Sequence, residues 1–160
     1  MVRNQQALDA FLSDVRTFVR DEVFAREAEI ERLDEVPADL VQTLREKGFF
    51  GWSIPQAYGG AGLSTEELVL GALELSQAAV AVRARVGTNT GIGAEGIVVD
   101  GTEAQKQQYL PRLASGEWTG CLAVTEPEAG SEATNVQTTA RRDGDSYILN
   151  GSKCYITNAP

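Results

Sequence analysis

The stretch TGCLAVTEPEAGS, residues 119–131, separates two parts of the chain with different sequence patterns. Before it, apolar residues recur every three or four positions, which is the spacing of amphipathic helices. Its own Cys121–Thr125 run is short and apolar, as in a strand, and turn signals are closely spaced from Val136 onward. The pattern predicts an α+β protein, with a helical domain over residues 1–118 and the beginning of a β domain over residues 119–160.

Helix-forming patterns and helix ends alternate through the first part of the chain. Apolar residues from Leu8 to Val19 lie on one stripe and predict a first helix that ends near Phe24. Pro37 suits the first turn of a second helix, and Gly48 suits the left-handed residue that ends it. Each of these helices has an apolar stripe that requires a partner surface.

Two capping boxes mark the starts of two further helices. In Ser64–Glu67 and in Thr102–Gln105, a hydroxyl can accept an N–H three residues on, while the Glu or Gln side chain reaches back. The helix after the second box is expected to run through Tyr109 and to meet Pro111. The helix after the first is expected to be long, central and buried, because apolar residues surround most of its circumference. These residues are Leu68, Leu70, Leu73, Leu75, Val80 and Val82.

Glycine is concentrated in two segments of the helical part. Residues 87–101, GTNTGIGAEGIVVDG, would lose about 1 kcal/mol per glycine relative to alanine if they were helical. They predict either a loop or poorly formed helix, or a close approach of backbone to a neighbour or ligand, and the pattern does not decide between these. Residues 58–62, YGGAG, follow no clear strand and lack the lysine of a phosphate loop, so a tight connection is the better interpretation.

The part after residue 118 is expected to contain a strand over Cys121–Thr125 and two hairpins. The pairs Asp143-Gly144 and Asn150-Gly151 are strong turn signals, because both central residues of the favoured turn have positive φ. A two-residue turn at the second pair fixes which side chains share a face of the ribbon. One face, which is apolar, carries Tyr147, Leu149, Cys154 and Ile156, and the other carries Ile148, Lys153, Tyr155 and Thr157.

Composition excludes several classes of function. The net charge of −9, without a block of Lys or Arg, argues against a nucleic-acid partner. The chain has no histidine, so histidine-based triads are excluded, and Cys121 and Cys154 alone do not support a metal site. No apolar run has the roughly 18 residues of a membrane span, and the N-terminus lacks the core of a signal peptide. We therefore expect a soluble, cytoplasmic protein.

The loop after the predicted strand carries residues suited to ligand binding. Glu126 and Glu128 flank Pro127 and could form an acid–base pair, although carboxylates in such loops are more often solvated or bound to backbone N–H groups. Pro127 stiffens the loop, and Gly130 allows close approach of the backbone. Ser131 adds a hydroxyl beside exposed N–H groups, which can hold an anionic or polar ligand.

The predicted second ribbon adds an aromatic side chain and a hydroxyl. Tyr155 and Thr157 are two residues apart and therefore point the same way. That pairing suits a flat ring system with a hydrogen-bonding nitrogen. A half-solvated strand face would give the same pattern, so both interpretations stay open from the residues alone.

Two motifs resemble those of the acyl-CoA dehydrogenase family. LAVTEPEAGSEA, residues 122–133, matches the family's T-E-P-x-A-G-S-[DE] loop, and LNGSKCYITNA, residues 149–159, matches its N-G-x-K-x-[WFY]-I-[TS]-N strand. The segments GFFGWSIPQAYGGAGLS and DGTEAQKQQYLPRLASGE match further family segments in the same order. The resemblance covers most of the chain and implies an all-α N-terminal domain followed by the first strands of a β-barrel or sandwich domain.

The resemblance implies that FAD is the cofactor and that both motifs contact it. The backbone near Val124 and the Thr125 hydroxyl would lie at the pyrimidine edge of the flavin. Tyr155, where the family commonly has tryptophan, would pack against the isoalloxazine, and the Thr157 hydroxyl would lie near N5. The implied cofactor-binding residues are Leu122, Ala123, Val124, Thr125, Gly130, Ser131, Tyr155, Ile156 and Thr157.

The resemblance also implies the substrate and the reaction. Ser131 would contact the acyl-CoA chain as well as FAD, and Thr88 would lie near the closed end of the acyl pocket. The family removes two hydrogens from an acyl-CoA thioester: a base takes the α-proton while the β-hydride passes to flavin N5. Electron-transfer flavoprotein then reoxidises the cofactor, and family members are usually homotetramers.

No catalytic residue is assigned within the chain. The family's base is a glutamate in a C-terminal helical domain, which corresponds to positions beyond Pro160. The isolated chain is therefore expected to bind flavin weakly and to be inactive. The alternatives are a flavin monooxygenase or nitroalkane oxidase on the same scaffold, and a non-catalytic interaction module or partner subunit.

Overall fold

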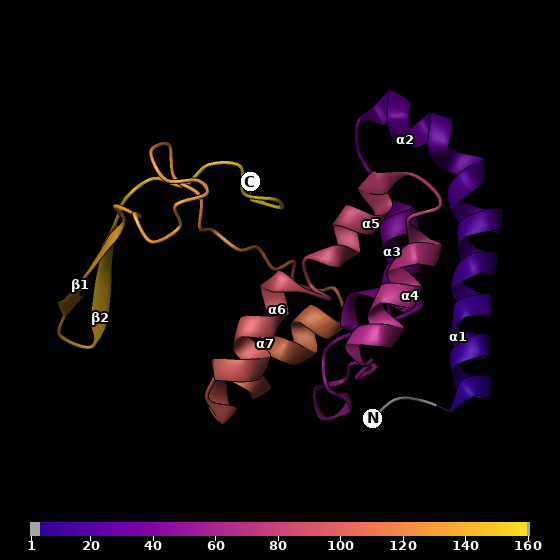
Figure 1. Ribbon diagram of the computed structural model, residues 1–160, viewed down its shortest axis with the longest axis horizontal. Coiled ribbons are helices and arrows are strands. Elements are labelled where there is room, and N and C mark those ends of the chain that lie inside the picture. Colours follow the sequence, from indigo (N-terminus) through magenta and orange to yellow (C-terminus); the bar gives the residue numbers. More distant parts are fainter. Residues whose placement is uncertain (1–3, 160) are drawn as a thin grey trace. The chain divides into compact units, whose positions relative to one another are not determined.

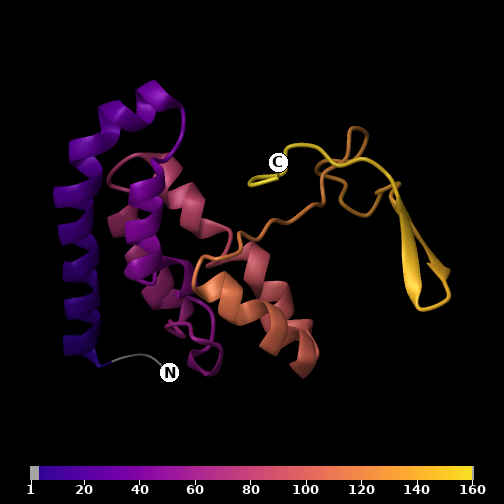
Figure 2. The same cartoon turned by 180° about the vertical axis from the view of Figure 1, so that it is seen from behind.

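The computed structural model describes residues 4–159 and separates into two compact units, residues 1–120 and 121–160. The first unit is helical, and Figures 1 and 2 show its helices from the indigo α1 onward. The second contains an antiparallel hairpin and long connecting segments. The helices of the first unit are α1 (Gln5–Phe18), α2 (Glu27–Leu33), α3 (Ala38–Glu46), α4 (Thr65–Leu75), α5 (Val80–Gly87), α6 (Ile92–Asp100) and α7 (Glu103–Ala114). The α+β fold class is therefore confirmed.

The first predicted helix belongs to a longer helical run. α1 continues through a π-helical turn, Val19–Val23, and a 3₁₀ turn, Phe24–Arg26, into α2. The two valines that bound the π turn are buried, so the wider turn keeps the apolar stripe on the core. The predicted end near Phe24 is wrong, because helical backbone continues to Leu33, where the left-handed Asp34 (φ 55°) ends it.

The second predicted helix is confirmed as α3. Pro37 directly precedes it, and Gly48 has a φ of +72° just after its end, as the left-handed stop requires. Leu40, Val41 and Leu44 are buried on the face that was expected to point inward.

The third predicted helix is shorter and more exposed than expected. The capping box forms at the start of α4, with Ser64 N–H donating to Glu67 at 2.8 Å and Glu67 N–H donating to the Ser64 hydroxyl at 3.3 Å. The helix ends after 11 residues, and Gln77 Nε2 donates to the Leu73 carbonyl at 3.2 Å, which satisfies one of the carbonyls left free at the helix end. Leu73 is 57% exposed and Val80, in α5, is 76% exposed. The prediction of one long, buried helix is therefore wrong.

The fourth predicted helix forms as α7 and passes through its proline. Thr102 and Gln105 make the predicted capping box. Pro111 lies inside the helix, which continues to Ala114 rather than stopping there. A proline in this position leaves the carbonyl of Gln107 without an intrahelical donor. Because Gln107 is exposed, water can bind that carbonyl, and the helix can continue.

The glycine-rich segment is helical and also makes a close backbone contact. It forms the end of α5, a turn and α6. A Cβ on Gly93 would lie 2.8 Å from the Thr88 carbonyl oxygen and 3.2 Å from Gly120 Cα, so only glycine fits there. A Cβ on Gly96 would meet open space. Of the two interpretations, close approach is correct at Gly93, and of the first interpretation the loop does not apply to residues 92–100, which are helical.

Two apolar clusters form the core of the helical unit. In the first, the Phe49 ring centroid lies 4.9 Å from that of Phe18 and 4.9 Å from that of Trp52, which joins α1 to the segment after α3. The second cluster holds α6 and α7 against the short segment before α4 that contains Ile54. Its members are Ile54, Ala94, Leu110, Leu113 and Ala114.

The YGGAG segment is the tight connection that the sequence predicts. Gly59 has a φ of +84° and Gly62 a φ of +61°. A Cβ on Gly60 would overlap the carbonyl oxygen of Ile54, so the chain folds closely on itself at this position.

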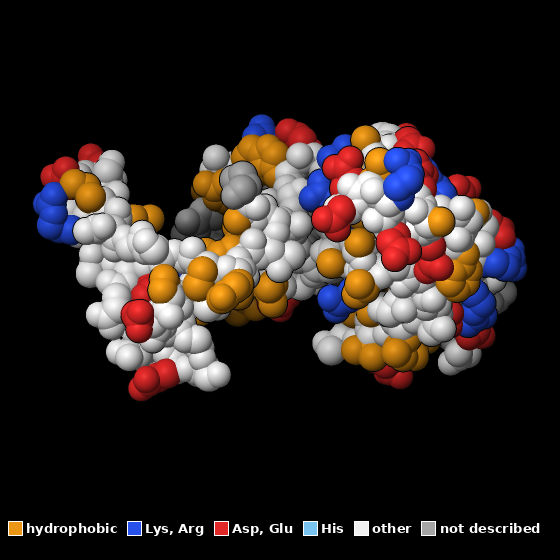
Figure 3. All heavy atoms as spheres, turned by 90° about the horizontal axis from the view of Figure 1, so that it is seen from above, with side chains coloured by type: hydrophobic (Ala, Val, Ile, Leu, Met, Phe, Trp, Pro, Cys, Tyr) orange, Lys and Arg blue, Asp and Glu red, His pale blue; other side chains and the backbone are white. Residues whose placement is uncertain are grey.

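Charged side chains of both signs are mixed over the surface (Figure 3). Arg26, for example, donates to both oxygens of Asp39, at 2.7 and 2.9 Å. Within residues 4–159, no helix combines the length and the apolar character that crossing a membrane requires.

The second unit contains one predicted hairpin. β1 (Thr139–Asp143) and β2 (Ser146–Asn150) pair antiparallel, and the two-residue turn between them is Gly144-Asp145. The turn lies one residue later than the predicted Asp143-Gly144. Gly144, with a φ of +61°, occupies its first central position, where that conformation is required.

The second predicted hairpin does not form in the described residues. Asn150 pairs with Thr139 at the end of the ladder instead of turning. A Cβ on Gly151 would overlap the Thr138 hydroxyl oxygen and lie 2.8 Å from Thr138 Cα, so this glycine lets the chain pass close beside β1. Residues 151–159 form no strand, and the predicted register and shared faces of this ribbon are wrong.

The predicted Cys121–Thr125 strand is also wrong. These residues have no ladder partner among residues 4–159, and their side chains are exposed apart from the half-buried Thr125. The segment has one backbone link to the next motif, in which Cys154 N–H donates to the Thr125 carbonyl at 3.0 Å. A single bond does not make a strand pair.

Asn89 is the polar centre of the helical unit. It is fully buried in the turn between α5 and α6. Its Nδ2 donates to the Leu113 carbonyl at 2.9 Å and to the Trp118 carbonyl at 2.8 Å, and its Oδ1 accepts from Gly120 N–H at 2.7 Å. One side chain therefore fixes the chain after α7 onto the α5–α6 turn.

We expect Asn89→Ala to lower the free energy of unfolding of the chain by about 3 kcal/mol, because it removes three hydrogen bonds of a buried amide and leaves the Trp118 carbonyl and the Gly120 N–H without their partner. Denaturant unfolding followed by circular dichroism measures the change. Gln108→Ala, at an exposed amide on α7, is the matched control and should change stability little. Equal stability of the two variants would show that the Asn89 bonds are not important for the fold.

Candidate functional site

The TEPEAGS loop begins with a tight turn. Glu126 N–H donates to the Ala129 carbonyl at 3.0 Å, and Ala129 N–H donates back to the Glu126 carbonyl at 3.2 Å. Pro127 occupies the second position of this four-residue turn, where its fixed φ is favourable. The turn buries the side chains of Glu126 and Ala129, while Glu128 points to solvent.

The buried Glu126 carboxylate is the centre of a polar cluster. It accepts hydrogen bonds from Gln137 N–H at 2.6 Å, from Thr138 N–H at 2.9 Å and from the Thr138 hydroxyl. Lys153 Nζ lies 2.8 Å from the same carboxylate and forms an ion pair with it. We call Glu126, Gln137, Thr138 and Lys153 the Glu126 cluster. The carboxylate is therefore structural, as the sequence analysis favoured.

The Glu126 cluster joins the two sequence motifs. Besides the carboxylate, Lys153 Nζ binds the Val124 carbonyl at 2.9 Å. The neighbouring residue, Cys154, donates its N–H to the Thr125 carbonyl. The Val124–Glu126 backbone and the Lys153–Cys154 backbone are therefore held side by side without a paired strand.

The cluster strongly favours the ionised carboxylate. The pKa of Glu126 is lowered from 4.5 to about 2, first by the hydrogen bond from Lys153 and then by those from the Thr138 hydroxyl and the Gln137 N–H. Glu126 is therefore charged at neutral pH and is not suited to accept a proton as a general base.

The predicted cofactor residues of the first motif form an exposed edge. Leu122 is 49% exposed and Val124 is 37% exposed, and Gly130 and Ser131 are also exposed. The backbone N–H groups of residues 122–125 donate to no other residue in the described part of the chain. This edge combines apolar side chains with free donors, which suits a flat ligand with acceptor atoms along one side.

The predicted cofactor residues of the second motif follow Lys153 directly. Tyr155 is 93% exposed, Thr157 is exposed and Ile156 is half-buried. Tyr155 also has a φ of +56°, a conformation that costs an aromatic residue roughly 1–2 kcal/mol. Backbone outliers of this kind cluster at ligand sites. The Lys153–Glu126 ion pair brings this segment to the first motif.

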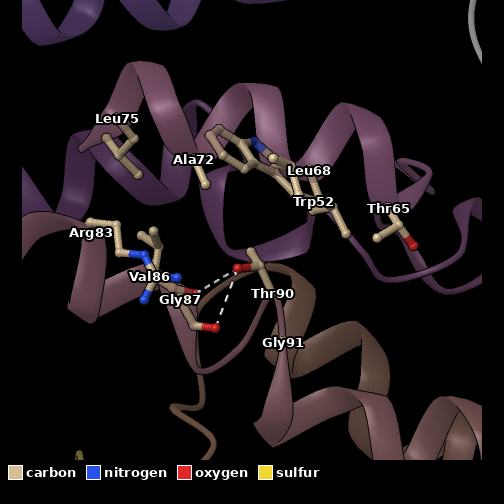
Figure 4. A pocket seen from close by; sticks show the side chains of 11 residues that line it. Trp52, Thr65, Leu68, Ala72, Leu75, Arg83, Val86, Gly87, Thr90 and Gly91 are labelled. Carbon is tan, nitrogen blue, oxygen red and sulfur yellow. Dashed lines mark hydrogen bonds between the residues drawn. The ribbon is translucent and has the colours of Figure 1, made fainter. Parts of the chain in front are cut away.

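The helical unit contains a separate pocket of about 190 Å³ (Figure 4). Trp52 and the facing surfaces of α4 and α5 line it, together with the turn after α5. Thr90 lies at this turn, and its hydroxyl binds the Val86 and Gly87 carbonyls at 3.2 and 3.4 Å. Thr88, the predicted substrate residue in this unit, is buried and is not one of the residues that line the pocket.

Sequence reasoning missed three contributors to these sites. Lys153 and Thr138 were not expected to bind Glu126, and Arg83 was not expected to line a pocket. The N-G-x-K spacing was a signal for Lys153, because a lysine just after a turn can reach a preceding loop. Among residues 4–159, no group of three or more His, Cys, Asp or Glu side chains could hold a metal ion.

Comparison with known families covers both units. Residues 5–117 match the acyl-CoA dehydrogenase N-terminal domain, and residues 121–160 match the acyl-CoA dehydrogenase middle domain. The chain belongs to the acyl-CoA dehydrogenase family. The family assignment that the two motifs suggested is therefore confirmed.

Individual relatives share this assignment. An acyl-CoA dehydrogenase of Bacillus subtilis is 39% identical over 144 residues, which are 90% of this chain and 38% of the relative. A Bacillus anthracis acyl-CoA dehydrogenase, solved in complex with FAD, is 34% identical with a TM-score of 0.85 over 96% of this chain and 27% of its own.

A third match is a structure described as an electron transferring flavoprotein of Acidaminococcus fermentans. It is 33% identical, with a TM-score of 0.88 over 96% of this chain and 40% of its own. The chain thus spans about 38% of the length of the Bacillus subtilis relative and 40% or less of the two structures.

The Glu126 cluster predicts acid-dependent order in the second unit. The pKa of Glu126 is lowered, so its charged carboxylate stabilises the folded second unit. This stabilisation is fully present above about pH 4.5 and is lost as the pH falls towards about 2. The Gln137 and Thr138 amide signals in NMR spectra should therefore keep their positions down to about pH 3 and then shift with a midpoint near 2.

Two variants separate this effect from general acid unfolding. In Glu126→Gln the shift of these amides with pH should disappear, whereas in Glu128→Gln, which removes an exposed carboxylate of the same loop, it should stay. A midpoint near 4.5 in the unmodified chain would mean that the cluster does not stabilise the charged form.

Proposed function

We propose that the chain supplies the N-terminal helical domain and the start of the middle domain of an FAD-dependent acyl-CoA dehydrogenase. The observation that carries the proposal is the match of both units to the family, combined with the ion pair that joins the two motifs. The enzyme would remove the α-proton and β-hydride of an acyl-CoA thioester. The flavin monooxygenase and interaction-module alternatives have no specific observation in their favour.

The residues of the second unit fit a flavin. The free N–H groups of residues 122–125 can donate to the acceptor atoms of its pyrimidine edge, and the exposed Leu122 and Val124 can cover part of the ring. Tyr155 is open for stacking, and the Thr157 hydroxyl is open to bind a ring nitrogen. When bound, FAD supplies the hydride-accepting chemistry. The relative solved with FAD supports this choice of cofactor.

The chain's own contribution would be positioning. Lys153 binds the Val124 carbonyl and the Glu126 carboxylate, and Cys154 N–H binds the Thr125 carbonyl, which together hold the Val124–Thr125 backbone in place. Ser131 and Gly130, on the open end of the loop, would contact FAD and the acyl chain, and Thr88 would lie near the end of the acyl pocket. No residue of this chain is proposed as the base.

The family also suggests the partners and setting of the enzyme. We propose an acyl-CoA substrate, reoxidation by an electron-transfer flavoprotein, and a cytoplasmic homotetramer. The match to a structure described as an electron transferring flavoprotein supports the redox partner.

Titration of the chain with FAD tests the cofactor assignment. We expect weak, saturable binding, seen as shifts of the backbone amide signals of residues 122–131 and 153–157 in NMR spectra. Bound flavin should not bleach on anaerobic addition of acyl-CoA, because the chain holds no assigned base. Absence of shifts at saturating FAD would contradict the proposed cofactor site. Steady acyl-CoA oxidation would contradict the expectation that no residue of this chain acts as the base.

Tyr155→Ala should weaken FAD binding about fivefold, because stacking of an aromatic ring on the flavin is lost. Quenching of flavin fluorescence on titration measures the dissociation constant and also reports stacking directly. Tyr147→Ala, which removes a 66% exposed tyrosine from β2, is the matched control and should bind FAD like the unmodified chain. Equal effects of the two substitutions would exclude Tyr155 as a stacking residue.

A further inference from the structure

A second cavity of the helical unit has two arginines in its lining. It measures about 380 Å³ and shares no lining residue with the pocket between α4 and α5. Arg45 comes from the last turn of α3, and Arg85 comes from the last turn of α5. The apolar residues of the lining are Val36, Ala38 and Val41. The cavity therefore combines two guanidinium groups with an apolar wall.

Both guanidinium groups are fixed on the same short segment after α7. Arg45 Nε donates to the Gly116 carbonyl at 3.0 Å, and Arg85 Nη1 donates to the Thr119 hydroxyl at 3.3 Å. A Cβ on Gly116 would lie 3.0 Å from Arg45 Cγ, so the glycine lets the arginine stem lie against the chain. Gly116 and Thr119 are three residues apart, which limits the separation of their Cα atoms to about 11 Å. The two side chains are therefore held in place near one another.

Neither of the two arginines has an acidic partner within residues 4–159. Each guanidinium has several N–H donors in a rigid fork, and one bond from each goes to a described residue. By contrast, Arg16, Arg20 and Arg26 each bind a carboxylate. The one acid in the lining, Glu35, is exposed and binds neither arginine. Both arginine side chains are half-buried, where a charge without a counter-ion is unfavourable, so an anion in the cavity would supply the missing partner.

We infer that this cavity binds an organic phosphate, with the phosphate monoester on Arg45 and Arg85 and the adjoining organic group on the apolar wall. A phosphate monoester carries a charge of about −2 at neutral pH and several terminal oxygens, so it can accept bonds from both forks. A monocarboxylate has less charge and is satisfied by a single bidentate guanidinium. The pair of arginines therefore favours the phosphate. The inference goes beyond the proposed function, because it involves neither the flavin nor the acyl group.

The phosphate monoester has two possible sources. One is CoA, which carries a 3′-phosphate, and the other is a free phosphorylated small molecule. Dephospho-CoA lacks the 3′-phosphate and otherwise equals CoA, so comparison of the two compounds distinguishes the sources. Binding of CoA but not of dephospho-CoA at the two arginines would assign the site to CoA. Binding of a simple phosphate monoester without binding of CoA would assign it to a free small molecule.

Propyl phosphate and butanoate test the inference, because they carry the same propyl group and differ in the anion. Each is titrated into the 17.2 kDa chain in about 0.15 M salt, which screens the overall charge of −9 beyond roughly 8 Å. The Nε–H signals of Arg45 and Arg85 are followed by NMR. We expect propyl phosphate to shift both signals and to bind about tenfold more tightly than butanoate, since it can bind both guanidinium groups.

Variants of the lining assign the binding to this cavity. Arg45→Met and Arg85→Met keep helix-forming apolar stems and should each weaken propyl phosphate binding about tenfold. Glu35→Gln removes the acid from the lining and should tighten binding about threefold, which a purely structural role of the arginines would not produce. Arg32→Met, which removes an exposed arginine of α2 outside the lining, is the matched control and should bind like the unmodified chain. Circular dichroism checks helix content, and if Arg45→Met lowers it, Arg85→Met and Glu35→Gln provide the test, because neither breaks a bond to the backbone.

Three results would overturn the inference. They are the absence of a shift in both Nε–H signals with propyl phosphate, equal affinities for propyl phosphate and butanoate, and unchanged phosphate binding in Arg45→Met and Arg85→Met. These measurements use neither flavin nor an acyl thioester, and the flavin titration is measured on residues of the second unit. Failure of the inference and failure of the proposed function are therefore distinguishable.

Discussion

The ion pair between Glu126 and Lys153 is the interaction on which the second unit depends. Every residue of β1 and β2 is exposed, so the hairpin buries almost no apolar surface within this unit. A two-stranded ribbon without such burial is marginally stable in water. The Glu126 carboxylate accepts four hydrogen bonds from two separate segments, Gln137–Thr138 and Lys153, and most of its lone pairs are used. A fully satisfied polar cluster thus takes the place of an apolar core.

The helical unit is organised in the opposite way. Its aromatic and aliphatic core aligns α1, α3, α4 and α5, and removal of apolar surface from water supplies the main driving force. The polar side chain of Asn89 then sets the position of the chain that leaves α7, because each of its three bonds ends on a different backbone group. Burial determines that the helices pack, and the directional bonds of one amide determine where the chain leaves them.

Features determined by neighbouring residues could be predicted from the sequence. The capping box at Ser64 and the stop at Gly48 need only residues within a few positions, and both form as expected. The Asn150-Gly151 pair fails for a physical reason that local pattern cannot show: Gly151 is needed where the chain passes Thr138, 13 positions earlier.

Residues 122–125, which are proposed to bind the flavin edge, have a fixed backbone but free N–H groups. Lys153 and Cys154 hold the Val124 and Thr125 carbonyls, so the backbone that would donate to a ligand is fixed before any ligand binds. A fixed donor loses little conformational entropy on binding, which favours affinity per contact. Tyr155 differs, because it is 93% exposed and adopts a strained φ with nothing covering its ring. The ordering cost of binding a flat ligand should therefore fall on the segment after Cys154, whereas the first motif is already in place to receive it.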